Sequence, residues 1–252
     1  MKKMMKKILL TFMCSLATVS AGEINIAVAA NVSYAMDELK KVFNIQNPDT
    51  KVNVTLGSSG KLTAQIKHAA PYQLFMSANM KYPEALYKEG LAVTKPLVYA
   101  QGALAYLSVK ERNYCAEINV LKEPDVQKIA IANPKTAPYG TAAVEALKNA
   151  KLYDKLKEKF VYGESISQTV IYATTAADIG IIAKSSLFSP QMVHFKEAIH
   201  WSDVDETLYT PIDQGIVILK MGEGNAEVKA FYDFMLGAEA KTILKLFGYK
   251  VL

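Results

Sequence analysis

Cysteine, histidine and tryptophan are scarce in this chain. Its 252 residues include two cysteines, three histidines and one tryptophan. Cys14 lies in the N-terminal apolar run, so the exported chain predicted below keeps Cys115 alone, which excludes a disulfide framework. His194 and His200 are six residues apart, a spacing that does not place two metal ligands on one helix face, and His68 stands apart. There is no Gly-x-Ser-x-Gly nucleophile elbow. Nothing in the sequence therefore demands catalysis.

A long apolar run is also missing. No segment after residue 21 has 18 consecutive apolar residues, the length expected of a membrane-spanning helix. The shorter run from Ile8 to Val19 follows four lysines and precedes Val19-Ser20-Ala21, which resembles a cleavage site. Residues 1–21 therefore predict a secretory signal that is cleaved after Ala21, and an exported protein in the periplasm.

Net charge is close to balanced once this signal is removed. The whole chain carries a formal +5, and because residues 1–21 hold four lysines and no acidic residue, residues 22–252 carry about +1. This balance gives no indication of nucleic-acid binding. Without disulfides, the exported chain must rely on its apolar core, and it is long enough for one large domain or two small ones.

One polar turn organises the sequence. Residues 51–56 alternate apolar and polar side chains as a half-buried strand does, and after Gly57-Ser58-Ser59-Gly60-Lys61-Leu62 the apolar residues fall at helical spacing. The turn into a helix N-terminus offers unpaired N–H groups, the positive end of the helix dipole and two hydroxyls, which suits a small anion. A nucleotide phosphate loop is excluded, because only two residues separate Gly57 from Gly60 and Leu62 follows Lys61.

The same strand–turn–helix unit recurs elsewhere in the chain. Residues 24–29 lead through 30–33 into a helix, for which Asn31 or Ser33 could serve as N-cap. Residues 128–132 lead through 133–140 into another helix, where Pro138 has no N–H and Tyr139 and Gly140 supply the first free donors. Residues 163–168 repeat the small polar turn, and a short helix is expected after it at 168–174.

Strands and helices alternate along the whole chain, which predicts an α/β architecture. Further strands are expected at 73–77, 103–109, 178–183 and 212–219, with 97–99 as a crossover and 202–206 as a polar connector. Further helices are expected at 82–89, ended by Gly90, at 153–160, and at 228–235 and 240–247, the last ended by Gly248. In such folds ligands gather beyond the carboxyl ends of the strands, where the polar turns lie.

The ordered set of motifs resembles one family. Ala29-Ala30-Asn31, the 57–62 turn with Gln65-Ile66, Asn133-Pro134 with Pro138-Tyr139-Gly140, and residues 229–234 (Lys-Ala-Phe-Tyr-Asp-Phe) are similar to the periplasmic molybdate-binding proteins of ABC importers. The resemblance covers essentially all of residues 22–252. It implies a two-lobed periplasmic-binding-protein-like II fold in which each lobe is a mixed sheet flanked by helices and two crossover segments join the lobes. Residues 22–103 plus 212–252 would form lobe 1, and 104–211 lobe 2.

The resemblance also implies a binding site. Asn31 and Ser59, with Ser58 beside them, would contact a tetrahedral oxyanion from lobe 1, and Tyr139 and Ile166 would donate backbone N–H groups from lobe 2. The metal is held only through hydrogen bonds to the oxygens of the oxyanion. Two departures stand out: many members have serine at the position of Asn31, and some use a tyrosine hydroxyl where this chain has Ala183.

The implied function is capture of molybdate or tungstate for an inner-membrane ABC permease, by a monomer with no cofactor and no catalytic activity. Two alternatives stay open at this point. The chain could bind another small anion or an organic solute, or it could be an exported enzyme on the same fold that uses His194 or His200.

Overall fold

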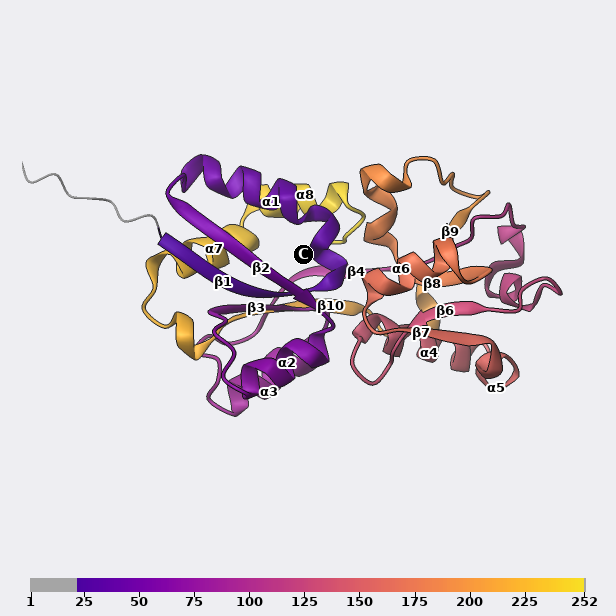
Figure 1. The fold of residues 1–252 in the computed structure, drawn as a ribbon, viewed down its shortest axis with the longest axis horizontal. Helices are drawn as coiled ribbons and strands as arrows, with labels where there is room; N and C mark the ends of the chain where they lie inside the picture. The colour runs from indigo at the N-terminus through magenta and orange to yellow at the C-terminus, as the bar shows by residue number, and fades with distance from the viewer. Residues whose placement is uncertain (1–21, 252) are drawn as a thin grey trace, which may run out of the picture.

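Two five-stranded mixed sheets form the framework of the molecule (Figure 1). The computed structural model describes residues 22–251, so the predicted signal at 1–21 lies outside the described residues. The first sheet has the order β2 (Thr50–Gly57), β1 (Gly22–Ala29), β3 (Leu74–Ser77), β10 (Ile212–Ile218) and β4 (Leu97–Gly102). Its strands β2, β1 and β3 are parallel, and β10 runs antiparallel to both of its neighbours, β3 and β4. The second has the order β7 (Phe160–Gly163), β6 (Ile129–Ala132), β8 (Ile179–Ala183), β5 (Leu104–Leu107) and β9 (Trp201–Asp203). This confirms the predicted fold class.

Helices cover both faces of each sheet, because the strand residues alternate between two apolar clusters. Ile26 and Val28 of β1 face one cluster of the first sheet, and Ala27 between them faces the other. The helices of the first half are α1 (Ser33–Gln46), α2 (Ser59–Lys67), α3 (Lys81–Lys88), α7 (Ala226–Leu236) and α8 (Ala238–Leu246); those of the second are α4 (Pro138–Asn149), α5 (Tyr153–Leu156) and α6 (Ile166–Thr175). Figure 1 shows α1 and α8 on one side of the first sheet and α2 and α3 on the other.

The chain passes between the sheets twice. It leaves the first sheet at the end of β4 and enters the second at β5, and it returns between β9 and β10. The lobe boundaries predicted at 103/104 and 211/212 fall in these two connections. We therefore propose that the two sheets with their helices are the two lobes, and we use lobe 1 and lobe 2 for them below. Among residues 22–251, no helix combines the length and apolar character needed to cross a bilayer.

Several local predictions were wrong. Phe160 begins strand β7 instead of ending a helix, and residues 97–99 belong to strand β4. Strand β9, at residues 201–203, overlaps the connector expected at 202–206 and pairs with β5. Leu56 was expected to face the core but is 49% exposed. Helices α4 and α6 begin earlier than expected, at Pro138 and Ile166, which places the first turn of each helix at the site described next.

Candidate functional site

A small cavity lies between the two lobes at the carboxyl ends of β1, β2 and β6. Its volume is about 190 Å³, which includes space open to solvent. The five residues predicted from the sequence all line it. The full lining is Ala29, Ala30, Asn31, Gly57, Ser58, Ser59, Ala78, Ala137, Pro138, Tyr139 and Ile166. The polar turns of four separate strand–turn–helix units thus converge on one place, although they lie up to 137 residues apart in sequence.

The two serines of lobe 1 keep their hydroxyl protons available. The side-chain oxygen of Ser59 accepts a hydrogen bond from the backbone N–H of Ala78 (2.9 Å), which orients the hydroxyl without using its proton. The side-chain oxygen of Ser58 is buried and has no partner among the described residues. A buried hydroxyl without a partner is costly, so a bound ligand that accepts from it would gain affinity.

The helix starts of lobe 2 offer backbone donors. In α4, Pro138 has no N–H, and the N–H groups of Gly140 and Thr141 both bond to the carbonyl of Ala137 (2.9 and 3.1 Å), so Tyr139 carries the first uncommitted N–H. A side chain at Gly140 would collide with the Ala132 carbonyl, its Cβ lying 2.1 Å away, so glycine lets the helix begin this close to β6.

Helix α6 is arranged in the same way. Its N-cap is Ser165, whose side-chain oxygen accepts from the N–H of Gln168 (3.3 Å) and whose carbonyl accepts from Thr169 (3.1 Å). Ile166 precedes these bonds, so its N–H has no intrahelical acceptor. Two helix N-termini of lobe 2 therefore point their positive ends toward the same cavity as the serines.

Asn31 plays a different part from the one its sequence position suggested. Neither it nor Ser33 caps α1, because Ser33 bonds to the Ala30 carbonyl (2.7 Å) and the N-cap is Val32 without a side-chain bond. The Asn31 amide nitrogen donates instead to Gln214 and to Tyr249, both at 2.8 Å, and its amide oxygen is buried without a partner. Sequence reasoning missed both of these neighbours.

The lobes are in direct contact around the cavity. The N–H of Gly60 donates to the carbonyl of Thr136 (2.9 Å), and the Ser167 hydroxyl donates to the carbonyl of Ala30 (2.9 Å). Lys61 of α2 forms an ion pair with Glu164 of lobe 2. These contacts join the turns that line the cavity, so the described arrangement is a closed one.

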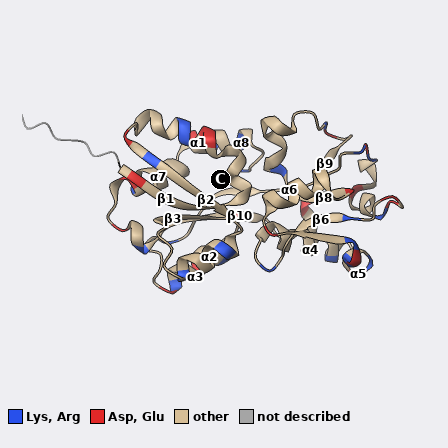
Figure 2. Cartoon of the chain, in the orientation of Figure 1, with Lys and Arg blue, Asp and Glu red and all other residues tan. Residues whose placement is uncertain are grey.

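The cavity wall contains no charged side chain. Its one ionisable group is Tyr139, and burial raises the pKa of that phenol well above its ordinary value of 10, so it stays neutral. Basic and acidic residues are instead interspersed over both lobes (Figure 2). Any positive potential in the cavity thus comes from N–H and O–H dipoles.

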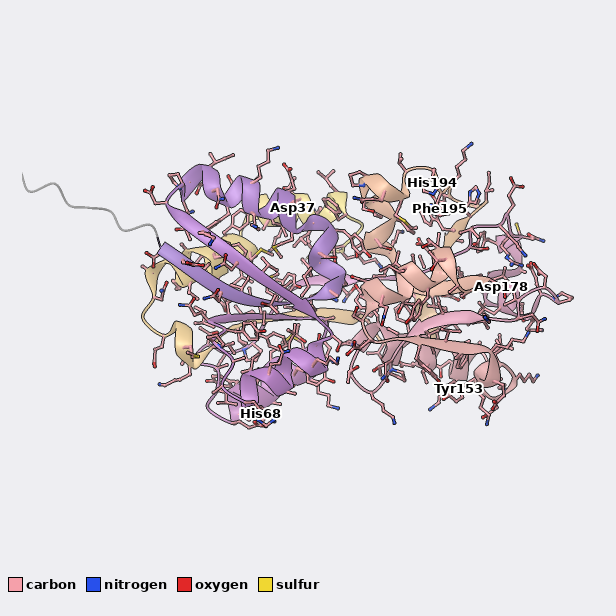
Figure 3. All side chains as sticks on the ribbon, in the orientation of Figure 1. Asp37, His68, Tyr153, Asp178, His194 and Phe195 are labelled. Carbon is pink, nitrogen blue, oxygen red and sulfur yellow. The ribbon has the colours of Figure 1, made fainter. Side chains whose placement is uncertain are left out.

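The remaining candidates lie elsewhere. Ala183 is fully buried in the core of lobe 2 and does not line the cavity, so nothing at that position supplies a hydroxyl to it. Figure 3 places His68 and His194 on the outer parts of different lobes, and the His200 ring accepts from the N–H of Lys196 (3.1 Å). Within residues 22–251, no three histidine, cysteine or acidic side chains gather as metal ligands.

Two α/β halves that close over a cavity of neutral donors define a solute-binding protein. Residues 24–250 match the family model described as bacterial extracellular solute-binding protein, and the chain belongs to this family. It is 37% identical over 232 residues to the molybdate-binding protein ModA of Rhodobacter capsulatus, covering 91% of this chain and 89% of that one. It is 35% identical over 231 residues to ModA of Azotobacter vinelandii, covering 91% and 90%.

Solved structures agree with these relatives. The Azotobacter vinelandii periplasmic molybdate-binding protein superposes with a TM-score of 0.82 and 32% identity, covering 91% of this chain and 99% of that one. The family resemblance inferred from the motifs is thereby confirmed.

Proposed function

We propose that this chain is a periplasmic receptor that captures molybdate, and also tungstate, for an ABC importer in the inner membrane. The observation that carries the proposal is a set of hydrogen-bond donors with available protons that line one cavity between the lobes. They are the Ser58 and Ser59 hydroxyls from lobe 1 and the Tyr139 and Ile166 backbone amides from lobe 2. The molybdate-binding names of its relatives support the choice of anion. We further propose that it acts as a monomer without a cofactor.

Neutral donors suffice to hold a doubly negative guest. Each hydrogen bond to an anionic oxygen is charge-assisted, and several of them together offset the hydration that the anion loses on burial. Donors are divided between the lobes, so the anion favours the closed arrangement over an open one. Sulfate carries the same charge as molybdate, so the size of the cavity must separate the two.

Titration calorimetry on residues 22–252, stripped of ligand by unfolding and refolding, tests the proposal directly. We expect molybdate and tungstate to bind with submillimolar or tighter affinity, and a panel of sulfate, phosphate and amino acids to bind more weakly. Failure of both molybdate and tungstate to bind would rule out this function. Stronger binding of another member of the panel would assign a different solute.

Affinity for molybdate should stay constant between about pH 7 and pH 9. No lining group titrates there, because burial keeps the pKa of Tyr139 above its ordinary value of 10 and its phenol therefore protonated throughout this range. Calorimetric titrations at three pH values, in buffers with matched ionic strength, measure this. A fall in affinity toward pH 9 would instead indicate a cationic group in the site.

Loss of the Lys61 charge should have a small effect. Lys61 and Glu164 are 53% and 52% exposed, and neither lines the cavity. Because exposed ion pairs contribute about 0–1 kcal/mol, Lys61→Ala should weaken molybdate binding by less than about fivefold. Lys135 is an exposed lysine in the turn at residues 133–140, and calorimetry with Lys135→Ala shows the effect of removing another lysine charge near the cavity. A loss of a hundredfold or more at Lys61 would refute recognition by neutral donors.

A further inference from the structure

The C-terminal segment reaches back to the cavity wall through Tyr249. Its hydroxyl oxygen accepts from the Asn31 side-chain amide (2.8 Å) and donates its own proton to the Asn31 backbone carbonyl (2.9 Å), 218 residues away in sequence. One phenol hydroxyl therefore forms hydrogen bonds with both the side chain and the main chain of Asn31. The hydroxyl is fully buried, and burial raises the pKa of Tyr249 to about 12, so it remains a donor at neutral pH.

Gln214 holds the same amide from a second direction. Its side-chain oxygen accepts from the Asn31 amide nitrogen (2.8 Å), and its own amide nitrogen donates to the carbonyl of Ile212 (2.9 Å). Gln214 is fully buried and lies where the register of β10 against β4 shifts, an irregularity that re-aims side chains. Both N–H bonds of the Asn31 amide are thus committed, and the orientation of that amide is determined by residues outside the cavity lining.

These partners are themselves firmly anchored. Lys250, next to Tyr249, exchanges two backbone hydrogen bonds with Gln101 of β4 (2.7 and 2.9 Å), which holds the C-terminal segment on the first sheet. The Asn31 carbonyl also accepts from the Ser185 hydroxyl of lobe 2 (3.0 Å). Asn31 is therefore the point where the cavity wall, the C-terminal segment and the opposite lobe meet.

We propose that Tyr249 and Gln214 are positioning residues of the oxyanion site, which act through Asn31 by fixing the turn it occupies. This inference rests on the proposed function. Both side-chain amide protons of Asn31 are committed, so Asn31 would offer the anion its backbone N–H, which lies in the first turn of a short helix. That turn would be fixed before binding, so the ligand would not have to order it. Removing the phenol hydroxyl frees one amide N–H and leaves the carbonyl with Ser185 alone, and the turn loses its fixed geometry.

The experiment compares Tyr249→Phe with Tyr99→Phe by molybdate titration calorimetry. Tyr99 is also a buried tyrosine of lobe 1, but its hydroxyl has no partner among the described residues, so Tyr99→Phe removes a buried phenol hydroxyl without breaking a hydrogen bond to Asn31. Tyr249→Phe removes two hydrogen bonds to Asn31 but acts on the anion only through that residue, so it should lower the affinity about three- to tenfold, and Tyr99→Phe should leave it unchanged. The same pair is then made in an Asn31→Ala background. That background lacks the side-chain amide but keeps the backbone carbonyl that accepts from Tyr249, so Tyr249→Phe should have a smaller effect there than in the wild type.

Each outcome decides a separate question. If wild-type protein binds molybdate and Tyr249→Phe binds equally well, or if the loss is just as large in the Asn31→Ala background, the positioning role is overturned while the proposed function stands. An equal loss in Tyr99→Phe would show a general effect of the core and would also overturn it. If wild-type protein binds neither oxyanion, the proposed function fails and this inference falls with it. Gln214→Leu replaces Tyr249→Phe in the same scheme if the tyrosine variant does not fold.

Discussion

Replacing Ile166 by proline is expected to weaken molybdate binding by about ten- to a hundredfold. Ile166 is the first residue of α6, where proline is well tolerated because the first N–H has no intrahelical acceptor. The preceding Ser165 is extended (φ −128°, ψ 166°), as a residue before proline must be. The substitution therefore deletes the proposed backbone donor and keeps the helix. A hydrogen bond to a charged group contributes about 1.5–3 kcal/mol, which gives the expected loss in a calorimetric titration.

Ile166→Ala separates the donor from the side chain. Ile166 is only 4% exposed and belongs to the core of lobe 2, so both substitutions remove apolar packing and should lower the free energy of unfolding. Only proline also removes the N–H. Alanine should therefore bind molybdate almost as tightly as the wild type while melting at a lower temperature. Equal affinities of the proline and alanine variants would exclude the Ile166 amide from the site.

Local sequence was enough to find the turns that line the cavity. A strand, a short run of glycine, serine or proline, and a helix start are all encoded within about ten residues, and their chemistry is local. That is why Ser58 and Ser59 after β2, and Tyr139 after β6, could be marked as anion-suited before any fold was known. Their convergence follows from the α/β architecture, which collects the carboxyl ends of the strands.

Interactions between distant residues could not be found in this way. Gln214 and Tyr249 lie 183 and 218 residues from Asn31, and nothing in the spacing of a strand or a C-terminal turn marks a partner so far away. Asn31 was therefore read as a possible helix cap, the local use of an asparagine at that position. The ion pair between Lys61 and Glu164 was not predicted for the same reason, because it forms only when the two lobes meet.

The short strands β7 and β9 were also not predicted from the sequence. Phe160 follows Tyr153 and Leu156 at helical spacing, but the helix ends and Phe160 pairs with Ile129 in a parallel ladder. Strand β9 spans three residues and is an edge strand that depends on its pairing with β5. In strands of three or four residues, pairing with a neighbouring strand outweighs the preference of the local sequence.

A valine at Gly60 is expected to weaken molybdate binding by about five- to a hundredfold without destabilising either lobe. A Cβ at this position would lie 3.0 Å from both Cα and O of Thr136 in lobe 2, and 2.7 Å from the Tyr82 hydroxyl of its own lobe. The tyrosine hydroxyl ends a flexible side chain and can move, whereas the Thr136 backbone cannot move without carrying lobe 2 with it. Overpacking of this kind costs about 1–3 kcal/mol, and here the cost falls on the closed arrangement alone.

Ala64→Val is the matched control for Gly60→Val. Ala64 is an exposed residue of the same helix, so this variant tests valine in α2 without the contact to lobe 2. Calorimetry should show a loss of affinity only for Gly60→Val, and thermal unfolding of the ligand-free protein should be similar for both variants. Small-angle scattering with excess molybdate should show a larger radius of gyration for Gly60→Val than for the control. If Gly60→Val binds as tightly as Ala64→Val, the close approach of α2 to Thr136 is not required for binding, and the anion does not need both lobes in contact.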